Sequence, residues 1–213
     1  MKKLLLLVAC IGFTASASAD ILSMTGSSDT VKTPSSGGPL PPPSGERTGT
    51  GIPYPTVDIP SWDLVLDPDN AVVLVDVGAA LGVPGGPATM NGIGWDVTLE
   101  AVGTSWLSEL RVYFDDNIAP DLIGLFLRPG VGSNFPGVGS FSSGGVIKLA
   151  DAGIPDILLP DGILRLEFHE TFDDVANAID GYWRSGSLTI QAIPEPASML
   201  LLALGGLALI RRR

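Results

Sequence analysis

Residues 95–101 read Trp95-Asp96-Val97-Thr98-Leu99-Glu100-Ala101, so apolar and polar side chains alternate strictly. Because successive side chains of a β-strand point to opposite faces, this period of two predicts a strand with one buried face and one solvent-facing face. The same alternation recurs over residues 110–114 and 164–169. These segments indicate a chain built from half-buried strands.

Further segments are short, apolar and bounded by turn residues, which predicts strands at residues 63–66, 71–77, 122–127, 146–149 and 187–192. Clusters of glycine, proline and serine mark the turns between them. Helical periodicity is almost absent, and only short helical turns are expected near residues 107–109 or 173–179. About eight short strands predict one all-β domain over residues 57–192, an antiparallel β-sandwich of the jelly-roll type.

The N-terminus has the order of a secretory signal peptide. Lys2-Lys3 precede an apolar run over residues 4–13, and small residues follow up to Ala19. This order predicts export across the inner membrane and cleavage by signal peptidase after Ala19. In the alternative, Cys10 is the lipidated residue of a lipoprotein signal, but the apolar stretch before Cys10 is shorter than usual. Cleavage after Ala19 removes the single cysteine, which excludes disulfides and cysteine-bound zinc.

Residues 20–56 are rich in serine, threonine, glycine and proline and lack apolar periodicity. Such a segment buries too little apolar surface to offset the entropy of ordering, so it predicts an extended linker. The formal net charge of the chain is −11, although several of its lysines and arginines lie at the two ends. A surface this acidic repels nucleic acid, so no nucleic-acid partner is expected, while cations or neutral polysaccharides are compatible with it.

The C-terminus combines Pro194-Glu195-Pro196, an apolar run over residues 197–210, and Arg211-Arg212-Arg213. A fourteen-residue helix is about 21 Å long, shorter than the roughly 30 Å hydrocarbon core of a bilayer. The run has no charged stripe, which favours a single transmembrane helix over a soluble amphipathic one. Since consecutive arginines resist transfer across the membrane, the C-terminus is expected in the cytoplasm and the domain in the periplasm.

This three-part order resembles the C-terminal sorting signal of the PEP-CTERM proteins of Gram-negative bacteria, and the resemblance covers residues 193–213. It implies that an exosortase, a membrane-embedded enzyme, recognises Pro194, Glu195 and Pro196 and cuts nearby. It also implies that Arg211, Arg212 and Arg213 act as the cytoplasmic stop. The two prolines fix φ and lack N–H donors, which agrees with an extended, accessible segment.

Acidic clusters in predicted turns are the candidates for a metal site. They bring together hard oxygen ligands of the kind that calcium prefers, although none has the spacing of an EF-hand loop. The candidate residues are Asp67, Asp69, Asp115, Asp116, Asp173 and Asp174. Solvated turns are the alternative, and no other cofactor is expected.

No catalytic residue is predicted. His169 is the single histidine and is expected to face solvent on a strand. The chain also lacks a Gly-x-Ser-x-Gly nucleophile elbow. The glycines of residues 130–132 and 137–139 do not complete a phosphate-binding pattern and are expected in loops. The tryptophans and tyrosines could stack on a sugar, but such residues more often fill a core.

Together these features predict a secreted, non-enzymatic protein of the cell envelope or extracellular matrix. Its C-terminal helix anchors it transiently before processing, and the product reaches the outer surface. The alternative is a carbohydrate-binding module for the exopolysaccharide of a biofilm. A third possibility, a hydrolase, has no supporting motif.

Overall fold

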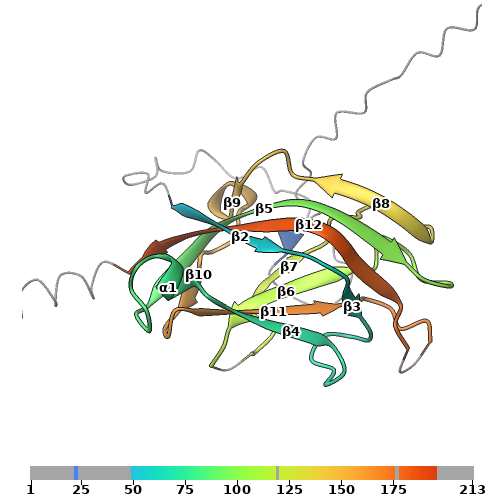
Figure 1. Cartoon of the computed structure of the whole chain (residues 1–213), viewed down its shortest axis with the longest axis horizontal. Coiled ribbons are helices and arrows are strands. Elements are labelled where there is room, and N and C mark those ends of the chain that lie inside the picture. Colours follow the sequence, from blue (N-terminus) through green and yellow to red (C-terminus); the bar gives the residue numbers. More distant parts are fainter. Residues whose placement is uncertain (1–21, 24–48, 119, 176–177, 196–213) are drawn as a thin grey trace, which may run out of the picture.

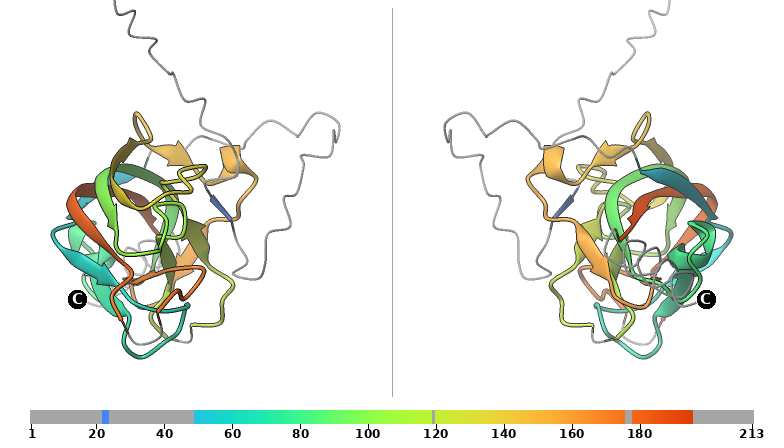
Figure 2. Two further views of the ribbon diagram at one scale, coloured as in Figure 1. Left: turned by 90° about the vertical axis from the view of Figure 1, so that its right-hand side faces the viewer. Right: turned by 90° about the vertical axis from the view of Figure 1, so that its left-hand side faces the viewer.

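Two antiparallel β-sheets pack face to face in the computed structural model of the protein, which describes residues 22–23, 49–118, 120–175 and 178–195. In Figure 1 the sheet that contains β5 and β12 lies above the sheet that contains β6, β11 and β4, and Figure 2 shows the same stack from its two ends. The prediction of a β-sandwich is confirmed.

The first sheet has five strands in the order β1-β7-β6-β11-β4. Their bounds are β1 Leu22–Ser23, β4 Ala71–Asp76, β6 Arg111–Asp116, β7 Leu125–Leu127 and β11 Ile163–His169. A short helix, α1 (Val77–Ala80), follows β4, and the side chain of Asp76 caps it by accepting a 2.7 Å hydrogen bond from the Ala79 backbone N–H.

The second sheet has seven strands, built on the path β10-β5-β12-β2, with β3 beside β12 and with β8 and β9 beside β5. Their bounds are β2 Thr50–Pro55, β3 Ile59–Ser61, β5 Ala88–Ala101, β8 Gly137–Ser142, β9 Ile147–Lys148, β10 Ile157–Leu159 and β12 Gly181–Pro194, with a 3₁₀ turn, η2, at Ala150–Ala152. Strands β5 and β12 pair along their length, from Gly181 opposite Ala101 to Pro194 opposite Ala88.

The core lies between the sheets and follows the predicted alternation. On β5, Trp95, Val97 and Leu99 are buried while Asp96 is exposed. On β11, Leu164 and Leu166 point into the same core. Burying each such side chain contributes about 1.5–3 kcal/mol, so the period of two seen in the sequence supplies most of the force that holds the sheets together.

Gly186 allows the closest backbone approach in the central pair. Its φ is +107°, and a Cβ at this position would lie 2.0 Å from the backbone oxygen of Asp96 on β5. The register of β12 against β5 shifts just before this residue, between Trp183 and Ser185. Only glycine fits this position, because any other residue would meet both the unfavourable φ and the backbone of the neighbouring strand.

The predicted linker of residues 20–56 is wrong at both ends, since Leu22–Ser23 form β1 beside β7. Residues 50–55 form β2, which pairs with β12, and Ile52 is buried in the core. Composition concealed this strand because Pro53 and Pro55 resemble linker residues. Proline cannot donate to a ladder, but it is tolerated on an edge strand, and β2 is the edge of its sheet. The predicted signal peptide of residues 1–19 lies outside the described residues.

Several local predictions were also wrong. Residues 63–66 form turns, and the strand lies earlier, at β3. The glycines of residues 137–139 begin β8 instead of a loop, because every second residue of β8 is half-buried. Strand β10 and the short helices α1 and η2 were missed. Residues 107–109 form a turn closed by the Glu109 N–H, which donates to Trp106 O at 3.0 Å, and the predicted turn at residues 173–179 lies partly outside the described residues. Within the described part of the chain no helix is long and apolar enough to cross a membrane, and the predicted transmembrane helix of residues 197–210 lies outside that part.

The outer face of the first sheet is buried at its centre, which the alternation did not predict. Tyr113 and Phe126 stack there with ring centroids 4.6 Å apart, and Phe126 meets the edge of His169 at 5.7 Å. The loop after β3 reaches this face, because the Leu66 N–H donates to the Glu167 carboxylate. His169 is only 2% exposed, so its predicted position facing solvent is wrong.

Candidate functional site

A group of three carboxylates, the Glu170 cluster, lies in the connection between β11 and β12. It consists of Glu170, Asp173 and Asp180, each of which brings an oxygen within 4.8 Å of the others. Backbone hydrogen bonds fix its two ends: the Glu170 N–H donates to Asp63 O at 3.1 Å, and the Asp180 N–H donates to Ser61 O at 3.1 Å. The cluster is therefore held against the chain that leaves β3.

Two carboxyl groups of the Glu170 cluster are buried, and the third, that of Asp173, is half-buried. Glu170 is 0% exposed and Asp180 is 2% exposed. No N–H or O–H donor of the described residues reaches either oxygen of Glu170, Asp173 Oδ1 or Asp180 Oδ2, so these oxygens lack a donor when the carboxyl groups are ionised. Two negative charges 4.8 Å apart repel by about 3 kcal/mol at an effective dielectric constant of about 20, so the ionised cluster opposes folding.

This environment shifts the titration of the nearby acids. Burial, a side-chain hydrogen bond to Asp180, and the charges of Asp180, Glu109 and Asp174 raise the pKa of Glu170 to about 10. Burial also raises the pKa of Glu109, with further contributions from Asp174 and Asp180, against the lowering effect of a hydrogen bond from the Trp106 backbone N–H. Without a counter-charge, Glu170 therefore holds a proton at neutral pH.

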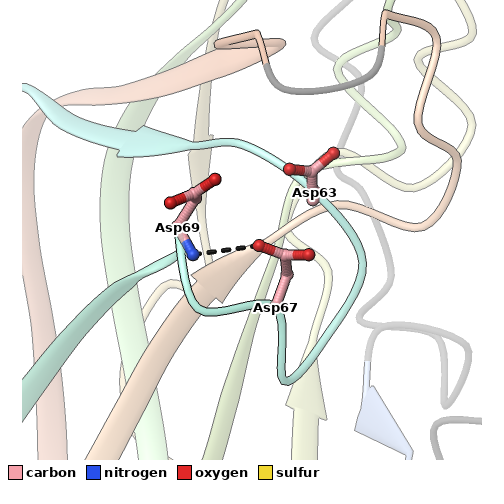
Figure 3. Close-up of side chains that lie close together, drawn as sticks. All are labelled: Asp63, Asp67 and Asp69. Carbon is pink, nitrogen blue, oxygen red and sulfur yellow. Dashed lines mark hydrogen bonds between the residues drawn. The ribbon is translucent and has the colours of Figure 1, made fainter.

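A second group, Asp63, Asp67 and Asp69, lies in the turn between β3 and β4 (Figure 3). In the figure the Asp69 N–H donates to Asp67 Oδ1, a bond of 2.9 Å. Asp63 is 7% exposed, whereas Asp67 is half-buried and Asp69 is exposed. Because Asp67 is engaged in the turn and Asp69 reaches water, this group has the properties of a solvated turn.

Among the described residues, Asp115 and Asp116 join no such group of metal ligands. Asp115 Oδ2 accepts hydrogen bonds from the Tyr113 hydroxyl and from the Asp121 N–H, and Asp115 Oδ1 accepts one from the Asp116 N–H. These donors satisfy a carboxylate that is 5% exposed, so its role is structural. A shallow pocket of about 170 Å³ lies beside these acids.

Of the predicted metal ligands, Asp67 and Asp69 lie together in the structure. Asp173 lies beside Glu170 and Asp180, which the sequence prediction did not include. Asp174 contributes charge but lies outside the group of three. Glu170, Asp180 and Asp63 were missed because only adjacent acids were considered. Glu170 and Asp180 flank the connection between two predicted strands, and this position was the available signal.

The aromatic residues are mostly structural. Trp95, Trp183 and Tyr113 are buried, and Phe168 meets Trp183 edge to face at 5.3 Å. Trp106, in contrast, is 42% exposed. The sugar-stacking prediction therefore retains Trp106 as its exposed tryptophan.

The predicted sorting motif begins inside the sandwich. Ala192 is buried on β12, opposite Met90 of β5, and Pro194 ends the strand opposite Ala88. Beyond the strand, the Glu195 N–H donates to Pro87 O at 3.1 Å, and the Thr89 hydroxyl donates to the Glu195 carboxylate. Pro196 and Arg211, Arg212 and Arg213 lie outside the described residues.

Comparison with protein families places a PEP-CTERM protein-sorting motif at residues 192–213. The resemblance stated from the sequence is confirmed. The motif implies that the protein is exported, sorted to the cell surface and processed by an exosortase.

Comparison with curated proteins found no match. Among solved structures, one titled "nora virus structure" aligns over 90% of this chain and 89% of that chain, with 10% identity and a TM-score of 0.27. At this TM-score the similarity carries no argument about fold or function.

Proposed function

We propose that the protein is a non-enzymatic β-sandwich protein that is anchored briefly in the inner membrane and then processed for the outer surface or extracellular matrix. The observation that carries this proposal is the sorting motif at residues 192–213, which continues directly from the central strand β12. The sandwich is the exported domain, and the motif is its sorting signal.

Each step of sorting has its own segment. Signal peptidase removes residues 1–19, the apolar run of residues 197–210 holds the chain in the bilayer, and Arg211–Arg213 stay in the cytoplasm. The exosortase then reads Pro194, Glu195 and Pro196. Glu195 supplies the charge of this motif, and the prolines keep the backbone extended.

The proposed jelly roll is supported by the strand orders. One sheet contains β4-β11-β6-β7, and the other contains β2-β12-β5 with β8 beside β5. Along the chain, β4, β5, β6, β8, β11 and β12 change sheet at nearly every step. Two interleaved Greek keys produce this alternation.

A non-enzymatic role is supported by the state of His169. Burial lowers its pKa to about 4, and its Nδ1 lies 2.8 Å from Glu170 O. A general base needs access to a substrate proton, and a 2% exposed imidazole packed on Phe126 has none.

The alternative, binding of exopolysaccharide, is favoured by one observation. The Trp106 side chain is 42% exposed. The backbone N–H of Trp106 donates a 2.7 Å hydrogen bond to the Glu109 carboxylate, so an exposed aromatic ring lies beside a polar acceptor. Binding on a glycan array that is lost on Trp106→Ala would support this function.

The main proposal is tested by the mass of the protein recovered from cells. In a host that has an exosortase, the mature protein should lack residues beyond a cut near Pro196, and in a matched host without the enzyme it should retain them. An intact mass through Arg213 in the mature population of the first host would contradict processing and leave only an anchor.

A further inference from the structure

We propose that Glu170, Asp173 and Asp180 bind a calcium ion at the end of the sandwich where β11 connects to β12. The first observation is the convergence of their oxygens within 4.8 Å. The second is that both oxygens of Glu170 and one of Asp180 are buried and accept no hydrogen bond from a donor group of the described residues. The one side-chain partner of Glu170 there is the Asp180 carboxyl, with which it can bond only by holding a proton that a cation would replace. A cation at this point would satisfy all of them at once.

Glu167, on β11, is a buried carboxylate whose charge is compensated by protein groups, and it serves as a comparison for Glu170. It is 0% exposed, like Glu170. Its Oε1 accepts hydrogen bonds from the Leu66 N–H and from Asn70 Nδ2, and its Oε2 pairs with Arg165 at 2.6 Å. Glu170, three residues later, accepts no hydrogen bond from an N–H group of the described residues, and none of the ion pairs found there includes it.

The backbone around the cluster is fixed before any ion binds. Glu170 and Asp180 are hydrogen-bonded through their N–H groups to Asp63 O and Ser61 O, and the Thr171 N–H donates to Glu109 O at 3.1 Å. Two of the three ligands therefore approach from positions that the sandwich already holds. Preorganisation of this kind reduces the entropy lost on binding.

The ligand chemistry selects a hard cation. All three donors are carboxylate oxygens, which excludes the nitrogen and sulfur set that zinc prefers. Calcium takes six to eight oxygens at about 2.3–2.6 Å, so oxygens on opposite sides of one ion are about 4.6–5.2 Å apart. Asp173 is only half-buried, which leaves room for waters to complete the shell. Magnesium demands a stricter octahedron and loses its water reluctantly, so calcium is the better match.

The test measures the thermal midpoint of the full-length chain in detergent, after chelation and then with millimolar calcium or magnesium. Two variants remove the site with little change in volume, Glu170→Gln and Asp180→Asn. Two matched controls remove a carboxylate elsewhere: Asp67→Asn in the turn of Figure 3, and Asp96→Asn on the exposed face of β5. Calorimetric titration of calcium into each protein gives the stoichiometry.

Wild type should bind one calcium per chain, and its midpoint should rise with calcium more than with magnesium. Glu170→Gln and Asp180→Asn should abolish that rise. In chelator the midpoint of Asp180→Asn should equal or exceed that of wild type, because the substitution removes a charge beside Asp173. The midpoint of Glu170→Gln should stay close to that of wild type, because a neutral amide replaces a carboxyl group that already holds a proton. The controls should respond as wild type does.

Three results would overturn the proposal: a wild-type midpoint that calcium leaves unchanged, a full calcium response in Glu170→Gln, or a response lost in Asp67→Asn alone. An equal response to magnesium would overturn the assignment to calcium.

Discussion

Thr89 of β5 donates a hydrogen bond from its hydroxyl to the carboxylate of Glu195, the middle residue of Pro194-Glu195-Pro196 in the sorting motif. The Glu195 N–H is also held, by Pro87 O at 3.1 Å. The motif therefore does not begin as a free tail, because its charged residue is attached to the sandwich. An enzyme that reads Glu195 must displace these two contacts.

Replacing Thr89 with valine should speed processing. The change removes the hydroxyl that binds Glu195 while keeping the shape of a side chain that is 7% exposed, so it releases the motif at a cost of about 1 kcal/mol in stability. Pulse-chase analysis of the cut in an exosortase-bearing host measures the rate. Thr98→Val on the same strand is the control, since it breaks a 3.0 Å hydrogen bond with Ser140 far from the motif. Equal rates in Thr89→Val and wild type would show that the contact does not limit access.

Replacing Glu195 with glutamine should leave the protein uncut and bound to the membrane. Glutamine keeps an oxygen that accepts from Thr89, so the contact with the sandwich is retained while the charge is lost. Membrane fractionation and intact mass distinguish this result from removal of Arg211–Arg213, which should release uncut protein because the basic stop is gone. Normal cutting of Glu195→Gln would mean that the enzyme does not read the charge.

Replacing Gly186 with alanine should destabilise the sandwich by about 1–3 kcal/mol or more. The residue has a φ of +107° and its added Cβ would meet Asp96 O at 2.0 Å. Gly82→Ala is the matched control, because its φ is +78° but nothing lies within 4 Å of the added atom. Denaturant unfolding of both variants separates backbone strain, present in each, from the clash, present only at Gly186. Equal losses would show that β12 can move away from β5 without cost.

Stability should fall at alkaline pH through Tyr113. Burial and the hydrogen bond to Asp115 raise the pKa of this phenol well above its ordinary value of 10. Above pH 10 the unfolded chain loses the phenolic proton and the folded chain keeps it. The unfolded state then binds fewer protons, so stability falls with rising pH by up to about 1.4 kcal/mol per unit.

Thermal midpoints between pH 9 and 11 measure this fall. This pH range brackets the ordinary tyrosine pKa of about 10. Tyr113→Phe should flatten the curve and lower stability at neutral pH by about 1 kcal/mol, since the bond to Asp115 is lost. Tyr182→Phe removes a phenol whose ring lies 3.8 Å from the Arg184 guanidinium and serves as the control. An unchanged slope in Tyr113→Phe would assign the alkaline fall to other groups.

The sequence predicted the sandwich because its strands alternate where one face is buried, as Trp95, Val97 and Leu99 do. It failed where a second layer covers the other face. Glu167 and His169 are polar by type, so they were assigned to solvent. The loop that carries Leu66 and Asn70 covers Glu167, and His169 packs against Phe126. Contacts across 97 and 101 residues leave no local pattern.

The candidate metal site was predicted in the same partial way. Asp173 was named from its neighbour Asp174, whereas its partners are Glu170 and Asp180. Glu170 and Asp180 lie at the two ends of the connection from β11 to β12, which joins one sheet to the other, and the structure brings them together. Asp180 is positioned by the pairing of Gly181 with Ser61, a long-range contact that has no local signature in the sequence. The sorting motif needed no such knowledge, because an enzyme reads it as a linear segment.

The position of β12 sets the timing of folding during export. It is the last strand of the sandwich, and it lies at the centre of its sheet, where it pairs with β2, β3 and β5. A chain that crosses the membrane from its N-terminus cannot close this sheet until residue 194 has emerged, because the pairings span most of its length. The apolar run starts at Ala197, so in the proposed sorting route the membrane anchor begins three residues after the end of β12. On the proposed function, anchoring in the bilayer and completion of the fold would therefore coincide, and the sandwich would close beside the membrane.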